Sequence, residues 1–219
     1  GLSLMVNIGN IPGKYARLTP QRDALIDIPN DRRINFAELH ERVCRLGNAL
    51  LETLELEKGD RVAVISKNCI EYMEVYYACA LCGLIAQPIN WRLGEEEMTR
   101  IVRDGDPSAV IYSSEYQALA KSILAELAIF HSLNFGPESD GSYETLLSQS
   151  AAHEPLVAAS VGDDDPVLIL YTGGTTGESK GALHTHRSLY AGMLNQTVAE
   201  RIVPSDVYML TGQMFHIPV

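Results

Sequence analysis

The sequence predicts an α/β fold in which a mostly parallel sheet is flanked by helices. Short apolar runs typical of strands recur along the chain, at residues 61–66, 84–90, 109–112, 167–171 and 207–210. Segments typical of helices lie between them, at residues 36–50, 69–82, 95–102, 115–130 and 188–200. Their apolar residues recur every three or four positions, as on an amphipathic helix. Strands that alternate with helices predict parallel pairing through helical crossovers.

Local signals set the expected ends of these elements. Asn35 with Glu38, and Asn68 with Glu71, each have the spacing of a capping box, so each pair predicts a helix start. Gly83 is expected to end the second of these helices. The carboxylates of 95–97 suit the first turn of the next helix. Pro88 places the strand at 84–90 near a sheet edge or a strand end.

The chain of 219 residues is long enough for one sizeable domain or two small ones. Residues 1–4 precede Met5 and are interpreted as a cloning remnant, which leaves 5–219 as the folded part. Glycines, prolines and a run of aspartates punctuate residues 134–166, which are interpreted as a connector. The aspartate run 163–165 is interpreted as a solvated loop rather than a metal site.

Composition excludes some classes of partner. The net charge of −11 argues against nucleic acid or an anionic membrane surface, which both require basic patches. The longest apolar stretch, at 76–86, is too short to span a bilayer. Cys79 and Cys82 have the spacing of a redox pair, but they lie near a helix end where the dipole disfavours a thiolate. They are interpreted as buried core residues in a reducing, cytoplasmic compartment.

The most informative segment, at 171–181, follows an apolar run and contains four glycines, three threonines, one serine and one lysine. Glycines let backbone N–H groups converge, and hydroxyls and a lysine add donors and charge, which suits a polyphosphate. A Walker loop needs lysine directly after its second glycine, whereas Lys180 follows Ser179. The Gly-x-Gly-x-x-Gly dinucleotide pattern is not matched either. A glycine-rich surface turn is the remaining alternative.

Residues 172–181 resemble the phosphate-binding signature of the AMP-binding, adenylate-forming superfamily, which includes acyl-CoA synthetases, 4-coumarate–CoA ligases, luciferases and peptide synthetase adenylation domains. Gly174 stands where many members have serine, and Ser179 where most have proline. Four further segments are similar to family sequences, at 58–63, 90–93, 184–189 and 214–216. In the last of these, Gln213 replaces the proline that usually precedes the segment.

The resemblance implies that Mg-ATP activates a carboxylic acid to an acyl adenylate, with release of pyrophosphate, and that CoA then accepts the acyl group. The residues that it assigns to phosphate binding are Thr172, Gly173, Gly174, Thr175, Thr176, Gly177 and Lys180. Lys180 would also stabilise the leaving pyrophosphate, and His216 would line the acyl pocket near the reacting carboxylate. His184 and His186 are expected to have a structural role at a helix start. No metal ligand is assigned.

The family's later motifs, including the magnesium glutamate, the ribose aspartate and the C-terminal lysine, are not found after Thr175. The chain is therefore expected to be the N-terminal part of the large domain of a longer enzyme and to be inactive alone. The apolar face that the missing part would cover is expected to allow self-association of this chain. Two alternatives stay open: an adenylating enzyme with another acceptor, such as a carrier protein, and a non-catalytic nucleotide-binding module. The segments 90–93 and 214–216 favour a fatty or aromatic acid.

Overall fold

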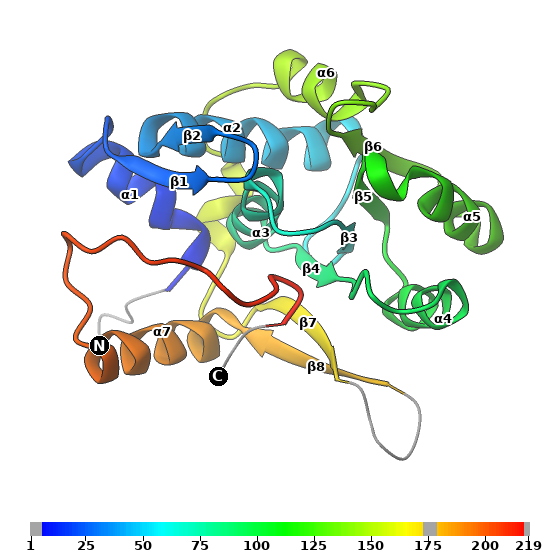
Figure 1. The fold of residues 1–219 in the computed structure, drawn as a ribbon. Coiled ribbons are helices and arrows are strands. Elements are labelled where there is room, and N and C mark those ends of the chain that lie inside the picture. Colours follow the sequence, from blue (N-terminus) through cyan, green and yellow to red (C-terminus); the bar gives the residue numbers. More distant parts are fainter. Residues whose placement is uncertain (1–5, 173–178, 217–219) are drawn as a thin grey trace.

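A six-stranded sheet forms the centre of the structure, a computed structural model that describes residues 6–172 and 179–216 (Figure 1). Its strands, in spatial order, are β6 (His131–Phe135), β5 (Ala109–Ser113), β3 (Arg61–Ile65), β4 (Ile85–Pro88), β7 (Pro166–Thr172) and β8 (Lys180–Thr185). All neighbouring strands pair in parallel except β7 and β8, which are antiparallel. The predicted mostly parallel sheet is confirmed.

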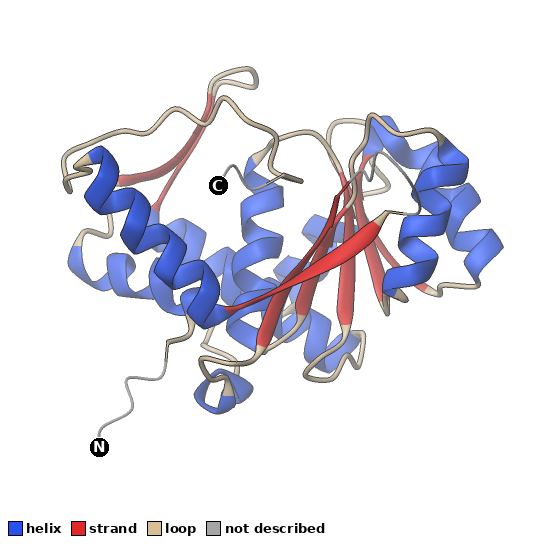
Figure 2. Cartoon of the chain, turned by 90° about the horizontal axis from the view of Figure 1, so that it is seen from below, coloured by secondary structure: helices blue, strands red, loops and turns tan. Residues whose placement is uncertain are grey.

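Helices cover both sides of this sheet (Figure 2). They are α1 (Ile11–Leu18), α2 (Phe36–Asn48), α3 (Ile70–Cys82), α4 (Glu95–Gly105), α5 (Gln117–Leu127), α6 (Ser142–Gln149) and α7 (His186–Glu200). Strand β3 shows why both sides must be covered, because successive side chains of a strand point to opposite faces. Val62 and Val64 pack in the core with α2 and α3, and Ala63 and Ile65 pack in the core with α4 and α5. All four side chains are fully buried.

The two predicted capping boxes have different outcomes. In α2 the box is confirmed: Asn35 Oδ1 accepts a hydrogen bond from Glu38 N, and Asn35 N donates to the Glu38 carboxylate, both at 2.9 Å. In α3 the prediction is wrong, because the N-cap is Cys69 and its side chain makes no capping bond. The side chain of Asn68 instead binds a segment near residue 213, which offers it two well-placed backbone groups.

Several strands differ from those expected. The hairpin β1 (Asp23–Asp27) and β2 (Arg32–Asn35) forms a separate antiparallel pair that the sequence pattern did not indicate. Strand β8 lies where the loop was expected to lead directly into a helix start. Residues 207–210 were expected to form a strand, but they form none, and Val207 is 80% exposed. These residues have strand-like composition without a neighbouring strand to pair with.

The segment 134–166, interpreted as a connector, contains α6 and a short 3-10 helix, Leu156–Ser160. The aspartate run lies in a loop before β7, as interpreted, but only Asp164 is exposed, while Asp163 and Asp165 are half-buried. Asp163 accepts from Val6 N and pairs with Arg187 at 3.0 Å. Asp165 pairs with Lys58 at 2.6 Å. Basic side chains from other elements reach these carboxylates and hold them in place.

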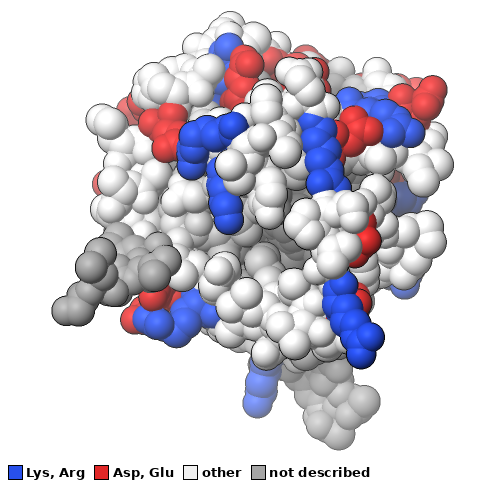
Figure 3. Space-filling view, turned by 90° about the vertical axis from the view of Figure 1, so that its left-hand side faces the viewer, with Lys and Arg blue, Asp and Glu red and all other residues white. Residues whose placement is uncertain are grey.

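The interpretation of Cys79 and Cys82 as core residues is confirmed, since both are fully buried and free. Burial raises the pKa of Cys82 to about 12, so its thiol stays protonated. In the part of the chain that the structure describes, every helix is too short or too polar to cross a membrane. On the face drawn in Figure 3, basic and acidic side chains lie intermixed.

Candidate active site

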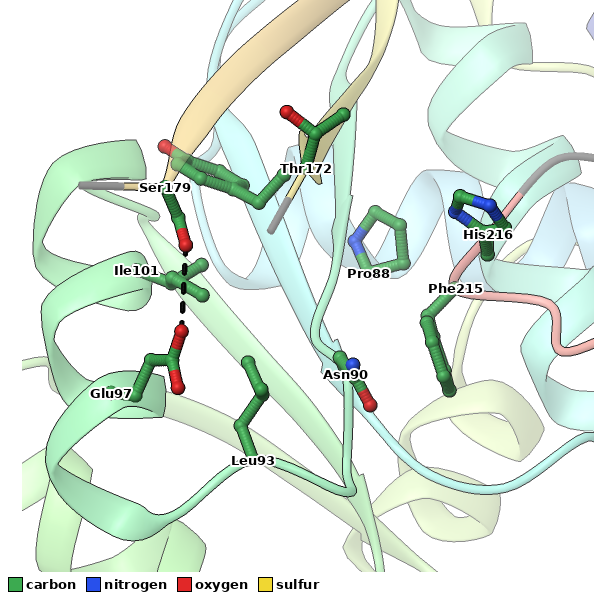
Figure 4. Close-up of a pocket in the computed structure, with 10 residues that line it drawn as sticks. Pro88, Asn90, Leu93, Glu97, Ile101, Thr172, Ser179, Phe215 and His216 are labelled. Atoms are coloured by element: carbon green, nitrogen blue, oxygen red, sulfur yellow. Dashed lines mark hydrogen bonds between the residues drawn. The ribbon is translucent and has the colours of Figure 1, made fainter. Parts of the chain in front are cut away.

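A pocket of about 380 Å³ opens beside the carboxyl ends of β4 and β7. Its lining residues come from four separate segments and are Pro88, Asn90, Leu93, Glu97, Ile101, Tyr171, Thr172, Ser179, Phe215 and His216 (Figure 4). Pro88 is the last residue of β4, and Thr172 is the last residue of β7. Pro88 therefore marks a strand end, one of the two predicted positions. Ligands of open α/β sheets bind outside the carboxyl ends of the strands, so this is the expected place for a site.

The antiparallel pair of β7 and β8 holds both ends of the glycine-rich loop. In its register Thr172 lies opposite Lys180, so the loop leaves and returns at one point of the sheet. Thr172 and Ser179 both line the pocket. Lys180 follows Ser179 and is exposed. The other predicted phosphate-binding residues lie outside the described residues, and they are Gly173, Gly174, Thr175, Thr176 and Gly177.

Contacts with α4 fix the base of this loop. The Tyr171 hydroxyl donates to Asp104 Oδ2 at 2.6 Å, and burial, with this bond to the carboxylate, raises the pKa of Tyr171. Gly181 lies opposite Tyr171, and a Cβ there would be 2.7 Å from Ile169 Cδ1. The missing side chain at Gly181 therefore leaves room for the side chain of Ile169. Ser179 Oγ donates to Glu97 Oε1 over 3.5 Å, a long contact at the mouth of the pocket (Figure 4).

His216 reaches the same pocket from the far end of the described chain. A turn precedes it, in which His216 N donates to Gln213 O at 3.0 Å. Phe215 and His216 lie on the side of the pocket opposite Glu97 (Figure 4). The structure thus brings His216 together with Thr172 and Ser179 around one cavity, although 44 residues (216 − 172) separate His216 from Thr172.

The other two predicted histidines lie beside the start of α7. His186 is fully buried, and its Nδ1 accepts a hydrogen bond from Ile8 N at 3.1 Å. Burial lowers the pKa of His186, while Asp165 and Asp163 oppose that shift. Thr185 and Ser188 form the capping box of α7, so this segment is fixed structurally.

Sequence reasoning did not assign several residues that line the pocket. Asn90 belongs to a segment that resembles the family, but its position was not foreseen. Glu97 was expected only as a carboxylate in the first turn of a helix. Tyr171 was expected as the end of a strand and the first residue of the glycine-rich segment, with no role assigned to its side chain. Their approach depends on the order of strands in the sheet, for which these residues carry no local signal.

The model of the AMP-binding enzyme family matches residues 14–218. The chain is 32% identical to long-chain-fatty-acid–CoA ligase FadD13 of Mycobacterium tuberculosis, over 97% of this chain and 42% of that protein. It is 30% identical to a feruloyl-CoA synthase of Amycolatopsis, over 95% and 39% of the two chains. The solved structure of ATP-bound MatB from Rhodopseudomonas palustris superposes with a TM-score of 0.77, at 28% identity, covering 94% of this chain and 41% of that one.

The chain therefore spans about two fifths of the length of the relatives that it matches. These relatives are named as acyl-CoA ligases, and the structural match covers the amino-terminal part of adenylate-forming enzymes. The family match extends over nearly the whole chain and includes both the glycine-rich loop and the His216 segment. The chain belongs to the AMP-binding enzyme family.

Proposed function

We propose that an enzyme containing this chain activates a carboxylic acid with ATP to an acyl adenylate and then transfers the acyl group to CoA, as an acid–thiol ligase. The observation that carries the proposal is the single pocket shared by the base of the glycine-rich loop and by His216. ATP would present its phosphates at the loop, and the acid would lie toward His216. The names of the relatives support a ligase of this class.

Each predicted site residue has a proposed role in that reaction. Thr172, Thr175 and Thr176 would donate hydroxyl hydrogen bonds to the β- and γ-phosphates, and Gly173, Gly174 and Gly177 would expose backbone N–H groups to them. Lys180 would place a positive charge where negative charge develops on the departing pyrophosphate. His216 would contact the acid near its reacting carboxylate.

The fit of Mg²⁺ follows from the oxygen ligands around the pocket. This ion prefers a few carboxylates together with substrate phosphates. Among residues 6–172 and 179–216, no group of three or more His, Cys, Asp or Glu side chains could hold a metal ion. Glu97 is the carboxylate that lines the pocket. These residues therefore fit a Mg²⁺ ion that enters bound to ATP. The charge of the ion would neutralise the phosphates beside the loop.

The test is acid-dependent ATP–pyrophosphate exchange by the longer enzyme across a panel of fatty and aromatic acids, followed by a thioester assay with CoA. We expect exchange with at least one acid and a CoA thioester from that acid. Exchange without a thioester would favour another acceptor. ATP binding with no exchange for any acid would sink the proposal and favour a nucleotide-binding module. The 219-residue chain alone is expected to show no exchange.

The proposal extends to the surface of the isolated chain. Apolar side chains of α7 and of the following segment are largely exposed, namely Met193, Leu194, Val198, Val207, Tyr208 and Met209. Apolar surface of this kind supports self-association. Sedimentation at increasing concentration is expected to show a rising average mass, and a constant monomer mass would contradict this point.

A further inference from the structure

The segment that carries His216 is held by side chains from elsewhere in the fold. Residues 212–216 form a turn without regular helix or strand. Asn68, just before α3, binds this segment with both ends of its amide. Its Nδ2 donates to Gly212 O, and its Oδ1 accepts from Met214 N, each at 2.8 Å. An asparagine that satisfies two backbone groups of one distant segment fixes both the position and the register of that segment.

Two further side chains bind the same stretch of chain, residues 212–214. The Tyr76 hydroxyl, on α3, donates to Met214 O. Trp91 Nε1, in the turn after β4, donates to Gln213 Oε1 at 3.2 Å. We call Asn68, Tyr76 and Trp91 the segment clamp. The Met214 side chain is itself buried in the core, which adds an apolar anchor to the polar ones.

Two cationic side chains flank the Trp91 end of the clamp. Lys67 Nζ and Arg92 Cζ lie 5.6 and 5.0 Å from the centre of the indole ring, within the range of cation–π attraction. Asn90, one residue before Trp91, lines the pocket. The clamp therefore joins the turn that follows Asn90 to the segment that carries His216.

We propose that Asn68 is a positioning residue for the acid half of the site: through Gly212 and Met214 it sets where Phe215 and His216 stand in the pocket. The last clamped residue, Met214, directly precedes these two lining residues, so a shift of the clamp moves them. The ATP half is held independently, by the β7–β8 ladder and by Tyr171 on Asp104. This inference rests on the proposed function for the identity of the acid half.

Two substitutions at Asn68 remove its hydrogen bonds to different extents. Asn68→Ala removes both hydrogen bonds, whereas Asn68→Asp keeps the acceptor for Met214 N and loses the donor to Gly212 O. Asn195→Ala, at an exposed position of α7, is the matched control. In the longer enzyme, Asn68→Ala is expected to lower kcat/KM for the acid roughly 10- to 100-fold, because small misplacements at a reacting centre cost that much. Asn68→Asp should fall between it and the wild type.

The pattern of kinetic constants separates positioning from general damage. For Asn68→Ala we expect KM for the acid to rise and KM for ATP to stay within about twofold, since the ATP half is held by other contacts. Equal changes in both KM values would overturn the proposal. So would an Asn68→Ala variant whose kinetics match those of Asn195→Ala.

A fluorescence measurement on the 219-residue chain reads the clamp without any turnover. Trp91 is its single tryptophan, and it contacts Gln213. Asn68→Ala is expected to shift Trp91 emission to longer wavelength and to increase its quenching by acrylamide, with unchanged far-ultraviolet circular dichroism. Asn195→Ala should leave the emission as in the wild type. Acrylamide quenching in Asn68→Ala equal to that in the wild type would overturn the clamp, whatever the activity of the longer enzyme.

The two arms distinguish failure of the inference from failure of the proposed function. A wild-type enzyme without acid-dependent exchange removes the proposed function, and the fluorescence result then decides by itself whether Asn68 holds the segment. If Asn68→Ala loses its circular dichroism signal, Asn68→Asp gives the reading, because it keeps one of the two hydrogen bonds. An emission spectrum of folded Asn68→Asp identical to that of the wild type would then count against the proposal.

Discussion

Removal of Arg42 is expected to destabilise the protein by about 3–5 kcal/mol, because it leaves a buried carboxylate without its cationic partner. Glu74, on α3, has no exposed side-chain surface. Arg42, on α2, donates to Glu74 through Nε at 2.6 Å and through Nη2 at 3.1 Å. Tyr143, on α6, donates to the same carboxylate at 2.7 Å. The Arg42 guanidinium and the Tyr143 hydroxyl thus offset part of the cost of burying Glu74.

The magnitude follows from how little water reaches this group. Burial raises the pKa of Glu74, and the Arg42 hydrogen bonds oppose that shift. In Arg42→Ala the Tyr143 hydroxyl still donates, so the loss should lie near the lower end of the range, at about 3 kcal/mol. An exposed pair is worth under about 1 kcal/mol, which gives the contrast that the experiment needs.

Urea unfolding at neutral pH, followed by circular dichroism, measures the effect. Arg33→Ala is the matched control, since Arg33 pairs with Asp23 at 2.7 Å while both side chains are largely exposed. The double change Arg42→Leu with Glu74→Leu should recover most of the lost stability, because it removes both buried charges. A loss in Arg42→Ala no larger than that in Arg33→Ala would refute the reasoning.

Three further outcomes are expected. The pKa of His186 is lowered by burial, so below about pH 6.5 the unfolded chain binds more protons than the folded one, and urea titrations should show stability falling as pH falls through that value. The raised pKa of Cys82 predicts slow reaction with a thiol reagent until urea unfolds the chain. A Cβ on Gly9 would lie 2.2 Å from Leu81 N, so Gly9→Ala should cost about 1–3 kcal/mol in the same titration, whereas Gly94→Ala, in open space, should cost less.

The sequence predicted β3, β4 and β5 because these strands are buried on both faces and are therefore almost continuously apolar, whereas β6 was not expected. Val62 to Ile65 is such a run. The hairpin β1–β2 carries charged residues, including Arg32 and Arg33, and its apolar run, at residues 24–26, is only three residues long. Strand β8 begins at Lys180, inside a motif whose glycines and lysine indicate a loop. Its strand conformation comes from pairing with β7, which the local sequence does not encode.

The candidate site was predictable where one short segment carries it. The spacing of 172–181 identified the loop, and its resemblance to a family added His216. Glu97 and Ser179 are 82 residues apart, and only the folded sheet brings them together. Asn68 was misassigned because asparagine three residues before a glutamate satisfies the capping-box pattern. Two backbone groups more than 140 residues away bind that side chain instead.

The central claim is that the loop between β7 and β8 binds the phosphates of ATP during acid activation. Acid-dependent ATP–pyrophosphate exchange by Lys180→Ala of the longer enzyme tests it most directly, beside Lys121→Ala at an exposed position of α5. We expect Lys180→Ala to lower exchange about 100- to 1,000-fold, as for loss of one electrostatic contact to developing charge, and Lys121→Ala to match the wild type. Equal exchange in both variants would contradict the claim.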